Sequence, residues 1–221
     1  MFAALLQILP LAFGSIAPTM IGLVVLLLSA ERGLLNALAF VLGKCVLYLL
    51  WGLLSLQLAG HISATNPGRH NPLLAAIFLI FGVLLLVLAL RNVFGEDDPD
   101  APPSKILTLL GKMGPLKLFG VGIGLSLLQP RFIFLILAGA ALIADARLSA
   151  TGNTACLLVL TLLAVWPMLI PILVYAVMGE RRHAAMKAMR RWLTDNRRKV
   201  NVVVMGVFGV LLLVWGLTGI L

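Results

Sequence analysis

The chain has 221 residues, of which 62% are hydrophobic and 11% are charged. Soluble domains contain about 45–50% apolar and about 25% charged residues, so this composition excludes an ordinary soluble domain and indicates an integral membrane protein. Two cysteines exclude a disulfide framework, and most of the net charge of +9 lies in short segments between apolar runs, which indicates membrane topology rather than nucleic-acid binding.

Six apolar stretches are long enough to cross a bilayer as helices, which takes about 20 residues each. Their runs of Leu, Val and Ile lack the alternation of barrel strands, and backbone amides in lipid must be satisfied within the segment. We therefore expect an all-α, multi-pass membrane protein with six transmembrane helices, and a retained first helix. The stretches cover approximately 5–28, 33–58, 72–90, 118–143, 153–178 and 200–220.

Lys and Arg are concentrated on one side of this bundle. The segments after the first, third and fifth stretches carry 13 of the 17 Lys and Arg, whereas the segments on the other side carry only Arg69 and Arg147. By the positive-inside rule we expect a bacterial inner-membrane protein with both termini extracytoplasmic.

An internal repeat divides the chain into two three-helix units. The heptapeptide Phe-Gly-Val-Leu-Leu-Leu-Val occurs at both 81–87 and 208–214, and the first and fourth stretches each contain a central proline, Pro18 and Pro130. Two three-helix units must enter the membrane from opposite sides, which predicts an inverted repeat. We assign 1–95 to the first unit, 96–117 to a cytoplasmic linker with a short amphipathic segment, and 118–221 to the second unit.

The second unit includes a basic amphipathic helix over 180–199. Its apolar residues fall on one helical face and its basic residues surround them, which is typical of a helix on an anionic membrane surface; a topology-setting cluster without a binding role is the alternative. The predicted surface residues are Arg181, Arg182, Lys187, Arg190, Arg191 and Trp192, and the apolar face is Ala185, Met186, Met189, Trp192 and Leu193.

Two cations, Lys44 and Arg131, fall near the centres of the second and fourth helices. A charge at the bilayer centre costs at least about 2.5–3.5 kcal/mol, and none of the eight carboxylates lies in a helix centre, so the expected partner is an anionic ligand. The alternative is that carbonyls freed around a proline satisfy them. The prolines create half-helix N-termini that favour anions, and nearby polar groups complete a candidate substrate site: Ser15, Pro18, Thr19, Asn36, Lys44, Gln129, Pro130 and Arg131.

Signatures of enzymes are weak. The three His lie in predicted loops, and no metalloprotease, nucleophile-elbow or paired-carboxylate motif appears, so we expect no catalytic residue, no metal and no cofactor. Cys45 and Cys156 occupy similar positions in their units, which leaves open a redox pair, although buried Cys is usually a small apolar filler.

The motifs resemble those of the GAP family, also called sulfolipid-1-addressing proteins, of the LysE transporter superfamily. They are the three-plus-three layout, Pro18 after Ser15-Ile16-Ala17, the run 36–43, Leu128-Gln129-Pro130-Arg131 and the basic segment around Trp192-Leu193. The superfamily usually has Asn-Pro-Lys in the fourth helix, so Gln129 and Arg131 are substitutions that keep the charge. The resemblance implies movement of glycolipids toward an actinobacterial cell surface. One related branch carries electrons through a Cys pair beside the prolines, but Thr19 and Arg131 occupy those positions here.

These observations favour a flippase-like transporter that moves an anionic envelope lipid or glycolipid, with Lys44 and Arg131 holding the headgroup. An exporter of a small anion or amino acid, a non-transporting scaffold for lipid-export machinery and a membrane thiol-redox relay remain alternatives. The expected partners are the lipid substrate, membrane lipids and lipid-synthesis or export proteins, without nucleic acid; homo-oligomerisation is left open.

Overall fold

The computed structural model describes residues 8, 15–30, 32–65, 72–94, 110, 113–146 and 148–218. These residues are helical without any strand, which confirms the all-α class. Both termini, Glu31, residues 66–71 and most of the linker, including its acidic run and amphipathic segment, lie outside the described residues, as do Arg147 and the side chains of Pro130, Arg131 and Asp145. The helices are α2 (Pro18–Leu28), α3 (Gly33–Thr65), α4 (Pro72–Phe94), α6 (Pro115–Leu127), α7 (Pro130–Asp145), α8 (Ala150–Val177), the 3-10 turn η1 (Gly179–Arg181) and α9 (Arg182–Thr218).

Three helices among the described residues are long and apolar enough to cross a membrane. They are Gly33–Gln57 in α3, Ala150–Val177 in α8 and Arg182–Leu217 in α9, and shorter apolar helices include Pro18–Leu28, Phe78–Arg91 and Pro115–Leu127. The predicted fourth span, 118–143, is two half-helices, because α6 ends at Leu127 and α7 begins at Pro130. The expected helix break at Pro130 is therefore present.

The last two predicted helices form one continuous helix. We expected a basic segment over 180–199 followed by a separate span over 200–220, but α9 runs from Arg182 to Thr218 without interruption. Residues 182–205 contain neither Gly nor Pro, so nothing in the backbone ends the helix where the composition changes from basic to apolar.

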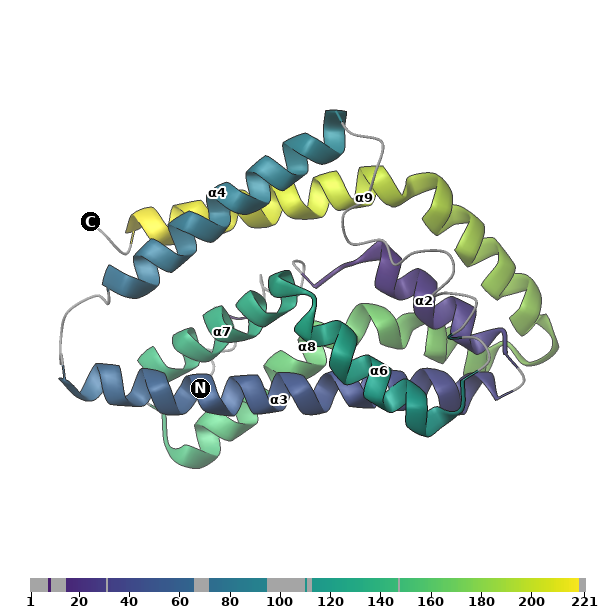
Figure 1. Ribbon diagram of the computed structural model, residues 1–221, viewed down its shortest axis with the longest axis horizontal. Coiled ribbons are helices and arrows are strands. Elements are labelled where there is room, and N and C mark those ends of the chain that lie inside the picture. Colours follow the sequence, from purple (N-terminus) through teal and green to yellow (C-terminus); the bar gives the residue numbers. More distant parts are fainter. Residues whose placement is uncertain are drawn as a thin grey trace.

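The helices form layers, with α4 and α9 side by side above the others (Figure 1). Below them, α3 packs against α6, α7 and α8, while α9 contacts α2 and α8. The continuous buried core draws side chains from all of these helices, including Leu23, Phe40, Phe132, Leu160 and Phe208. α3 thus lies at the centre of the lower layer, where it contacts both halves of the broken fourth helix.

The repeated heptapeptides pack against each other. A side chain at Gly82 would meet Leu213, and one at Gly209 would meet Leu86. Gly82 and Gly209 are the second residues of the two heptapeptides, and Leu86 and Leu213 are the sixth. Exchanging the two heptapeptides therefore converts each contact into the other, which is the relation that a two-fold axis between α4 and α9 produces.

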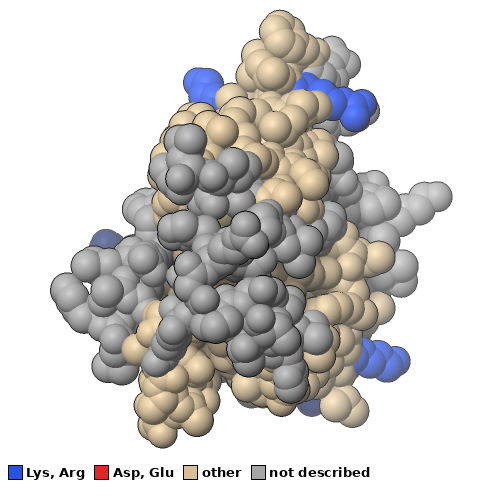
Figure 2. Space-filling view, turned by 90° about the vertical axis from the view of Figure 1, so that its left-hand side faces the viewer, with Lys and Arg blue, Asp and Glu red and all other residues tan. Residues whose placement is uncertain are grey.

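Parts of the segments that we expected to be cytoplasmic lie together at one end of the molecule, whereas the C-terminal end of α4 lies at the top of Figure 1. Figure 1 shows the junctions of α2 with α3 and of α8 with α9, together with the start of α6, at its right-hand end. The Arg198 guanidinium on α9 also donates a hydrogen bond to the carbonyl oxygen of Val93, at the end of α4. Figure 2 looks at the opposite end of the molecule. Among the described residues in this view, the Lys and Arg side chains lie only along the edge of the molecule.

Two glycines allow α3 and α6 to approach closely. A side chain at Gly43 would collide with the carbonyl oxygen of Phe119, and one at Gly122 would collide with the carbonyl oxygen of Phe40. Small residues allow such backbone contacts in membrane bundles. The crossing matters for function because it brings the middle of α3 against the end of α6.

We expect Gly122→Ala to lower the free energy of unfolding by about 1–3 kcal/mol, since a methyl group there must displace the α3 backbone. Gly124→Ala is the matched control, because a side chain at Gly124 in the same helix meets nothing within 4 Å. Thermal unfolding of the purified protein in detergent measures both. Equal midpoints for the two variants would show that the close crossing contributes nothing to stability.

Candidate functional site

Two helices begin at proline inside the bundle, with the same local geometry. The first residues of α2 and α7 are Pro18 and Pro130, a position where the missing N–H of proline would have no helical partner. The carbonyl oxygen of Ala17 accepts from the amides of Met20 and Ile21, at 3.0 Å each. The carbonyl oxygen of Gln129 likewise accepts from residues 132 and 133, at 3.1 and 3.4 Å. Both breaks thus create a helix N-terminus within an apolar segment.

Lys44 lies at the middle of the α3 span, directed toward the second break. It is 11 residues from Gly33 and 13 from Gln57, the ends of that span, and has no exposed surface. Its ammonium Nζ donates to the Ser126 hydroxyl at 3.0 Å and to Gln129 Oε1 at 3.2 Å. Both of these acceptors are uncharged oxygen atoms, and they hydrogen-bond the ammonium inside the bundle.

Three aromatic rings surround the same ammonium. The distances from Nζ to the ring centroids are 5.7 Å for Phe40, 5.5 Å for Tyr48 and 5.2 Å for Phe132. The rings of Tyr48 and Phe132 also stack, with centroids 5.9 Å apart. Cation–π contacts at this range contribute about 2 kcal/mol when desolvated. The rings of Phe40, Tyr48 and Phe132 thus form an aromatic cage around the ammonium, which offsets part of the cost of burying a charge at the bilayer centre.

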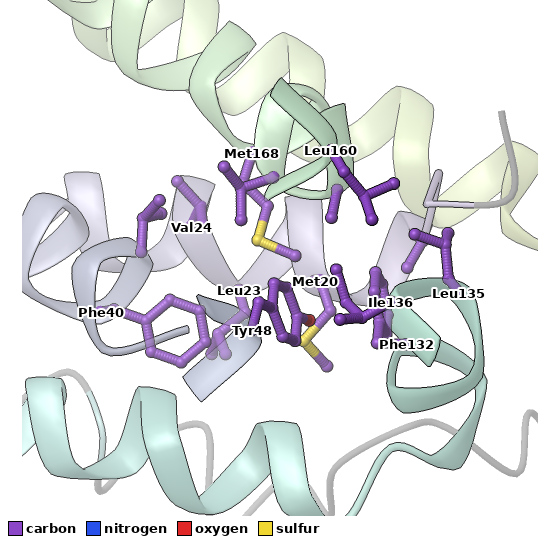
Figure 3. Close-up of a cluster of buried hydrophobic side chains, with 14 of the residues drawn as sticks. Met20, Leu23, Val24, Phe40, Tyr48, Phe132, Leu135, Ile136, Leu160 and Met168 are labelled. Carbon is purple, nitrogen blue, oxygen red and sulfur yellow. The ribbon is translucent and has the colours of Figure 1, made fainter. Parts of the chain in front are cut away.

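The hydrogen-bond partners of Lys44 connect four helices. The Ser126 hydroxyl of α6 donates to the carbonyl oxygen of Gly122 at 2.7 Å. The amide nitrogen of Gln129, between α6 and α7, donates to the sulfur of Met20 on α2 at 3.3 Å. Met20, Tyr48 and Phe132 converge in one buried cluster (Figure 3). These hydrogen bonds thus link Lys44 on α3 to α2 and to both halves of the broken helix.

The other predicted site residues occupy different positions. Ser15 is buried, but its hydroxyl donates to the carbonyl oxygen of Leu163 on α8 at 3.0 Å. Thr19 is half-buried, and Asn36 is buried on α3, eight residues before Lys44. Arg131 is the second residue of α7, so its backbone lies at the break. Of the predicted set, the structure brings Lys44 and Gln129 into direct contact.

Sequence analysis missed the aromatic cage. Phe40, Lys44 and Tyr48 are spaced by four residues, which places them on one face of a helix, and that spacing was a readable signal. Phe132 could not be assigned in this way, because its position depends on where the broken fourth helix places α7.

The basic segment of α9 packs its apolar face onto protein, not onto lipid as expected. Met186 and Leu193 are buried, and Ala185 and Met189 pack partly buried against the same core. Trp192, by contrast, is 56% exposed. The basic residues on this segment are also exposed: Arg181, Arg182, Lys187, Arg190, Arg191, Arg198 and Lys199. The segment therefore presents charge, with a single large aromatic side chain, at the cytoplasmic end predicted from the sequence.

The two cysteines are free thiols on separate helices. Cys45 is half-buried on α3 and Cys156 is buried on α8. Among the described residues there is no group of three or more His, Cys, Asp or Glu that would hold a metal ion.

The family model described as Sap, sulfolipid-1-addressing protein, matches residues 8–218. The chain belongs to this family. Neither the curated proteins nor the solved structures include a match. The Sap match covers both helix breaks, Lys44 with its partners and the basic segment of α9, so the features described above lie within the family region. The family name indicates a role in lipid addressing, in agreement with an apolar helical bundle.

Proposed function

We propose that this Sap-family protein is an inner-membrane transporter that moves the headgroup of an anionic envelope lipid across the bilayer, with Lys44 as the principal binding residue. The observation that carries the proposal is a fully buried lysine at mid-span, next to the helix break, whose ammonium lies among three aromatic rings and donates to Ser126 and Gln129. A charge in this position is expensive, and intramembrane charges generally mark substrate pathways. An anionic headgroup is the class of ligand that a buried ammonium attracts most strongly.

Binding requires the site to open, because Lys44 has no exposed surface in this structure. A headgroup oxygen competes with the Ser126 hydroxyl and with Gln129 Oε1 for the ammonium protons. Release of Gln129 also weakens its hydrogen bond to Met20, so headgroup entry loosens the contact between α2 and the α6–α7 break. The N-termini of α2 and α7 favour the incoming anion through their helix dipoles.

The lipid chains need no protein channel. Large apolar side chains are exposed along α3, α4, α8 and α9, among them Leu42, Leu84, Leu162 and Val207, and these surfaces suit contact with acyl chains. The polar groups of the described helices are few, so they suit one headgroup rather than a long hydrophilic pore for a small solute. This contrast favours a lipid over a small anion or amino acid.

The proposed architecture is six spans arranged as two inverted repeats, within the LysE superfamily. Two features support it: the matching hydrogen bonds at Ala17 and Gln129, and the reciprocal contacts of Gly82 and Gly209 across α4 and α9. The α2–α3 and α8–α9 junctions lie at the same end of the molecule, and the second of them is strongly basic. This arrangement supports an orientation with the α8–α9 junction in the cytoplasm and both termini outside. The exposed Arg and Lys of α9 then face the anionic leaflet, where each contributes about 1 kcal/mol to attracting acidic lipid.

We expect deletion of the gene to leave an envelope lipid synthesised but retained inside the cell. Mass spectrometry of surface-extracted and whole-cell lipids measures the fraction of that lipid that reaches the cell surface. A gene copy carrying Lys44→Met should not restore surface lipid, whereas Lys187→Met, which removes an exposed lysine on α9, should restore it. An unchanged surface-lipid profile in the deletion strain would contradict the proposal.

A further inference from the structure

We propose that the break between α6 and α7 is a lateral portal, through which a lipid headgroup passes between the bilayer and Lys44, and that Leu127 and Leu128 close this portal. The proposal rests on the proposed function and extends it, because it names the route by which a headgroup reaches a residue that has no exposed surface. It also assigns this role to the second helix break and not to the first.

The second break passes from the core to the outer surface within one residue. Ser126 and Gln129, which accept hydrogen bonds from Lys44, are buried. Leu127 and Leu128 lie between them in the sequence and are 50% and 77% exposed. Consecutive Cα atoms are about 3.8 Å apart, so each acceptor adjoins an exposed leucine. The segment that holds the ammonium on one side is thus itself part of the outer surface.

The outer face of α6 is open to the bilayer. The main contacts of α6 are with α3 and with α7, which continues the chain beyond the break. Gly122 meets α3, but a side chain at Gly120 or Gly124 would meet nothing within 4 Å among the described residues. Lipid tails are as apolar as leucine, so exposed leucines at this depth are stable in contact with acyl chains. A lipid can therefore lie against α6 with its headgroup next to the break.

The backbone of the break can move at little cost. α6 ends at Leu127 and α7 begins at Pro130, so Leu128 and Gln129 belong to neither helix. The Gln129 amide donates to the carbonyl oxygen of Ser126 at 3.4 Å, beyond the usual range of about 2.7–3.2 Å. Proline has no N–H, so residue 130 adds no backbone hydrogen bond to the end of α6. Displacement of the two leucines thus sacrifices one weak hydrogen bond at the break itself.

The first break is closed by protein. From Ser15 to Met20 every residue is buried or half-buried. The Ser15 hydroxyl donates to the carbonyl oxygen of Leu163 on α8 at 3.0 Å. That carbonyl is available because residue 167, whose amide would bond to it in a regular helix, is a proline. The first break is therefore fixed to α8 and offers no comparable opening to the bilayer.

The test places a photoreactive side chain in the portal. Benzoylphenylalanine in place of Leu128 captures the lipid beside it on illumination, and in place of Leu162 it does so at an exposed mid-span position of α8. The full chain is reconstituted in phosphatidylcholine vesicles with a minority of phosphatidylglycerol, and mass spectrometry identifies the captured lipid. At position 128 we expect phosphatidylglycerol to be enriched about tenfold over its share of the vesicle, the smallest effect of a charge-assisted hydrogen bond to Lys44. Position 162 should show no enrichment, and Lys44→Met should abolish the enrichment at position 128.

A second measurement distinguishes a residue that closes the portal from one that binds the lipid. Leu128→Ala shortens the closing side chain and should speed the movement of phosphatidylglycerol across vesicles about fivefold, which corresponds to about 1 kcal/mol of barrier. Its affinity for phosphatidylglycerol should stay within about twofold of the wild type, because an easier opening speeds entry and exit together. Leu162→Ala, the same substitution at an exposed leucine of α8, is the matched control and should change neither quantity.

Capture of the two lipids in proportion to their shares at position 128, by a protein that binds phosphatidylglycerol through Lys44 in detergent, would overturn the portal. Equal rates of lipid movement in the wild type and Leu128→Ala would also overturn it. Either result would leave the role of Lys44 intact. Failure of the wild-type protein to bind phosphatidylglycerol in preference to phosphatidylcholine is a different outcome, since it would contradict the proposed function itself and this inference with it.

Discussion

Lys44→Met should lower the affinity for an anionic lipid by roughly 10- to 100-fold, the effect of losing a charge-assisted hydrogen bond worth about 1.5–3 kcal/mol. The protein should remain folded, with a thermal midpoint equal to or above that of the wild type. Methionine keeps the length of the chain and its contacts with Phe40, Tyr48 and Phe132, and it removes the cost of a buried charge. The Ser126 hydroxyl keeps its hydrogen bond to the carbonyl oxygen of Gly122.

Binding of phosphatidylglycerol, measured by native mass spectrometry, gives the affinity, and thermal unfolding in detergent gives the stability. Lys187→Met changes the net charge by the same amount on an exposed face of α9 and should lower the affinity by at most about fivefold, because an exposed lysine near the membrane surface contributes at most about 1 kcal/mol. Loss of folding in Lys44→Met would show that the charge is structural. Arg131→Gln tests the other mid-span cation in the same way, and we expect weaker binding by a folded protein.

Gln129→Glu should abolish anionic-lipid binding almost as completely, although Lys44 is retained. Glutamate has the same shape as glutamine, and it places a carboxylate oxygen where Gln129 Oε1 now lies, 3.2 Å from the Lys44 ammonium. The resulting ion pair neutralises Lys44 inside the bundle, so a lipid anion must separate two buried charges to bind. Breaking such pairs costs about 3–5 kcal/mol, which predicts a loss of at least 100-fold.

Gln129→Leu separates charge from shape in this experiment. It removes the same acceptor and the hydrogen bond to Met20 without adding a negative charge, so Lys44 stays cationic and binding should fall much less than in Gln129→Glu. Thermal midpoints identify any loss of folding. Equal losses of binding in the two variants, with both folded, would refute an electrostatic role for Lys44 and indicate that the geometry of the break alone is required.

The helices were largely predictable because their apolar runs are unambiguous in a bilayer. The two breaks could also be read, since Pro18 and Pro130 interrupt otherwise continuous spans and proline starts a helix more readily than it continues one. The continuity of α9 could not be predicted from the sequence in this way. A change from basic to apolar residues suggests two elements, but the backbone contains no Gly or Pro at that point, and helix formation depends on the backbone.

The site was predicted in part. Lys44 was identifiable because a charge at mid-span is rare and must be accommodated, and Gln129 because it adjoins the break. Lys44 and Arg131 were equivalent on the sequence, and the partners of Lys44 across α6 and the break could be assigned only from the structure. The apolar face of the basic segment shows a further limit. Periodicity identifies a face that avoids water, but it does not distinguish protein from lipid, and Met186 and Leu193 pack onto the core.

The most direct test of the central claim is lipid movement by the purified protein in phosphatidylcholine vesicles. A trace of phosphatidylglycerol labelled on an acyl chain is included, and dithionite added outside reduces only the label in the outer leaflet. With the wild-type protein, the inner-leaflet phosphatidylglycerol should become reducible, while labelled phosphatidylcholine stays protected and Lys44→Met prevents the effect. If both lipids stay protected as in protein-free vesicles, the claim that the protein moves anionic lipid is contradicted. Equal movement of phosphatidylglycerol by the wild type and by Lys44→Met would contradict the role of Lys44 in that movement.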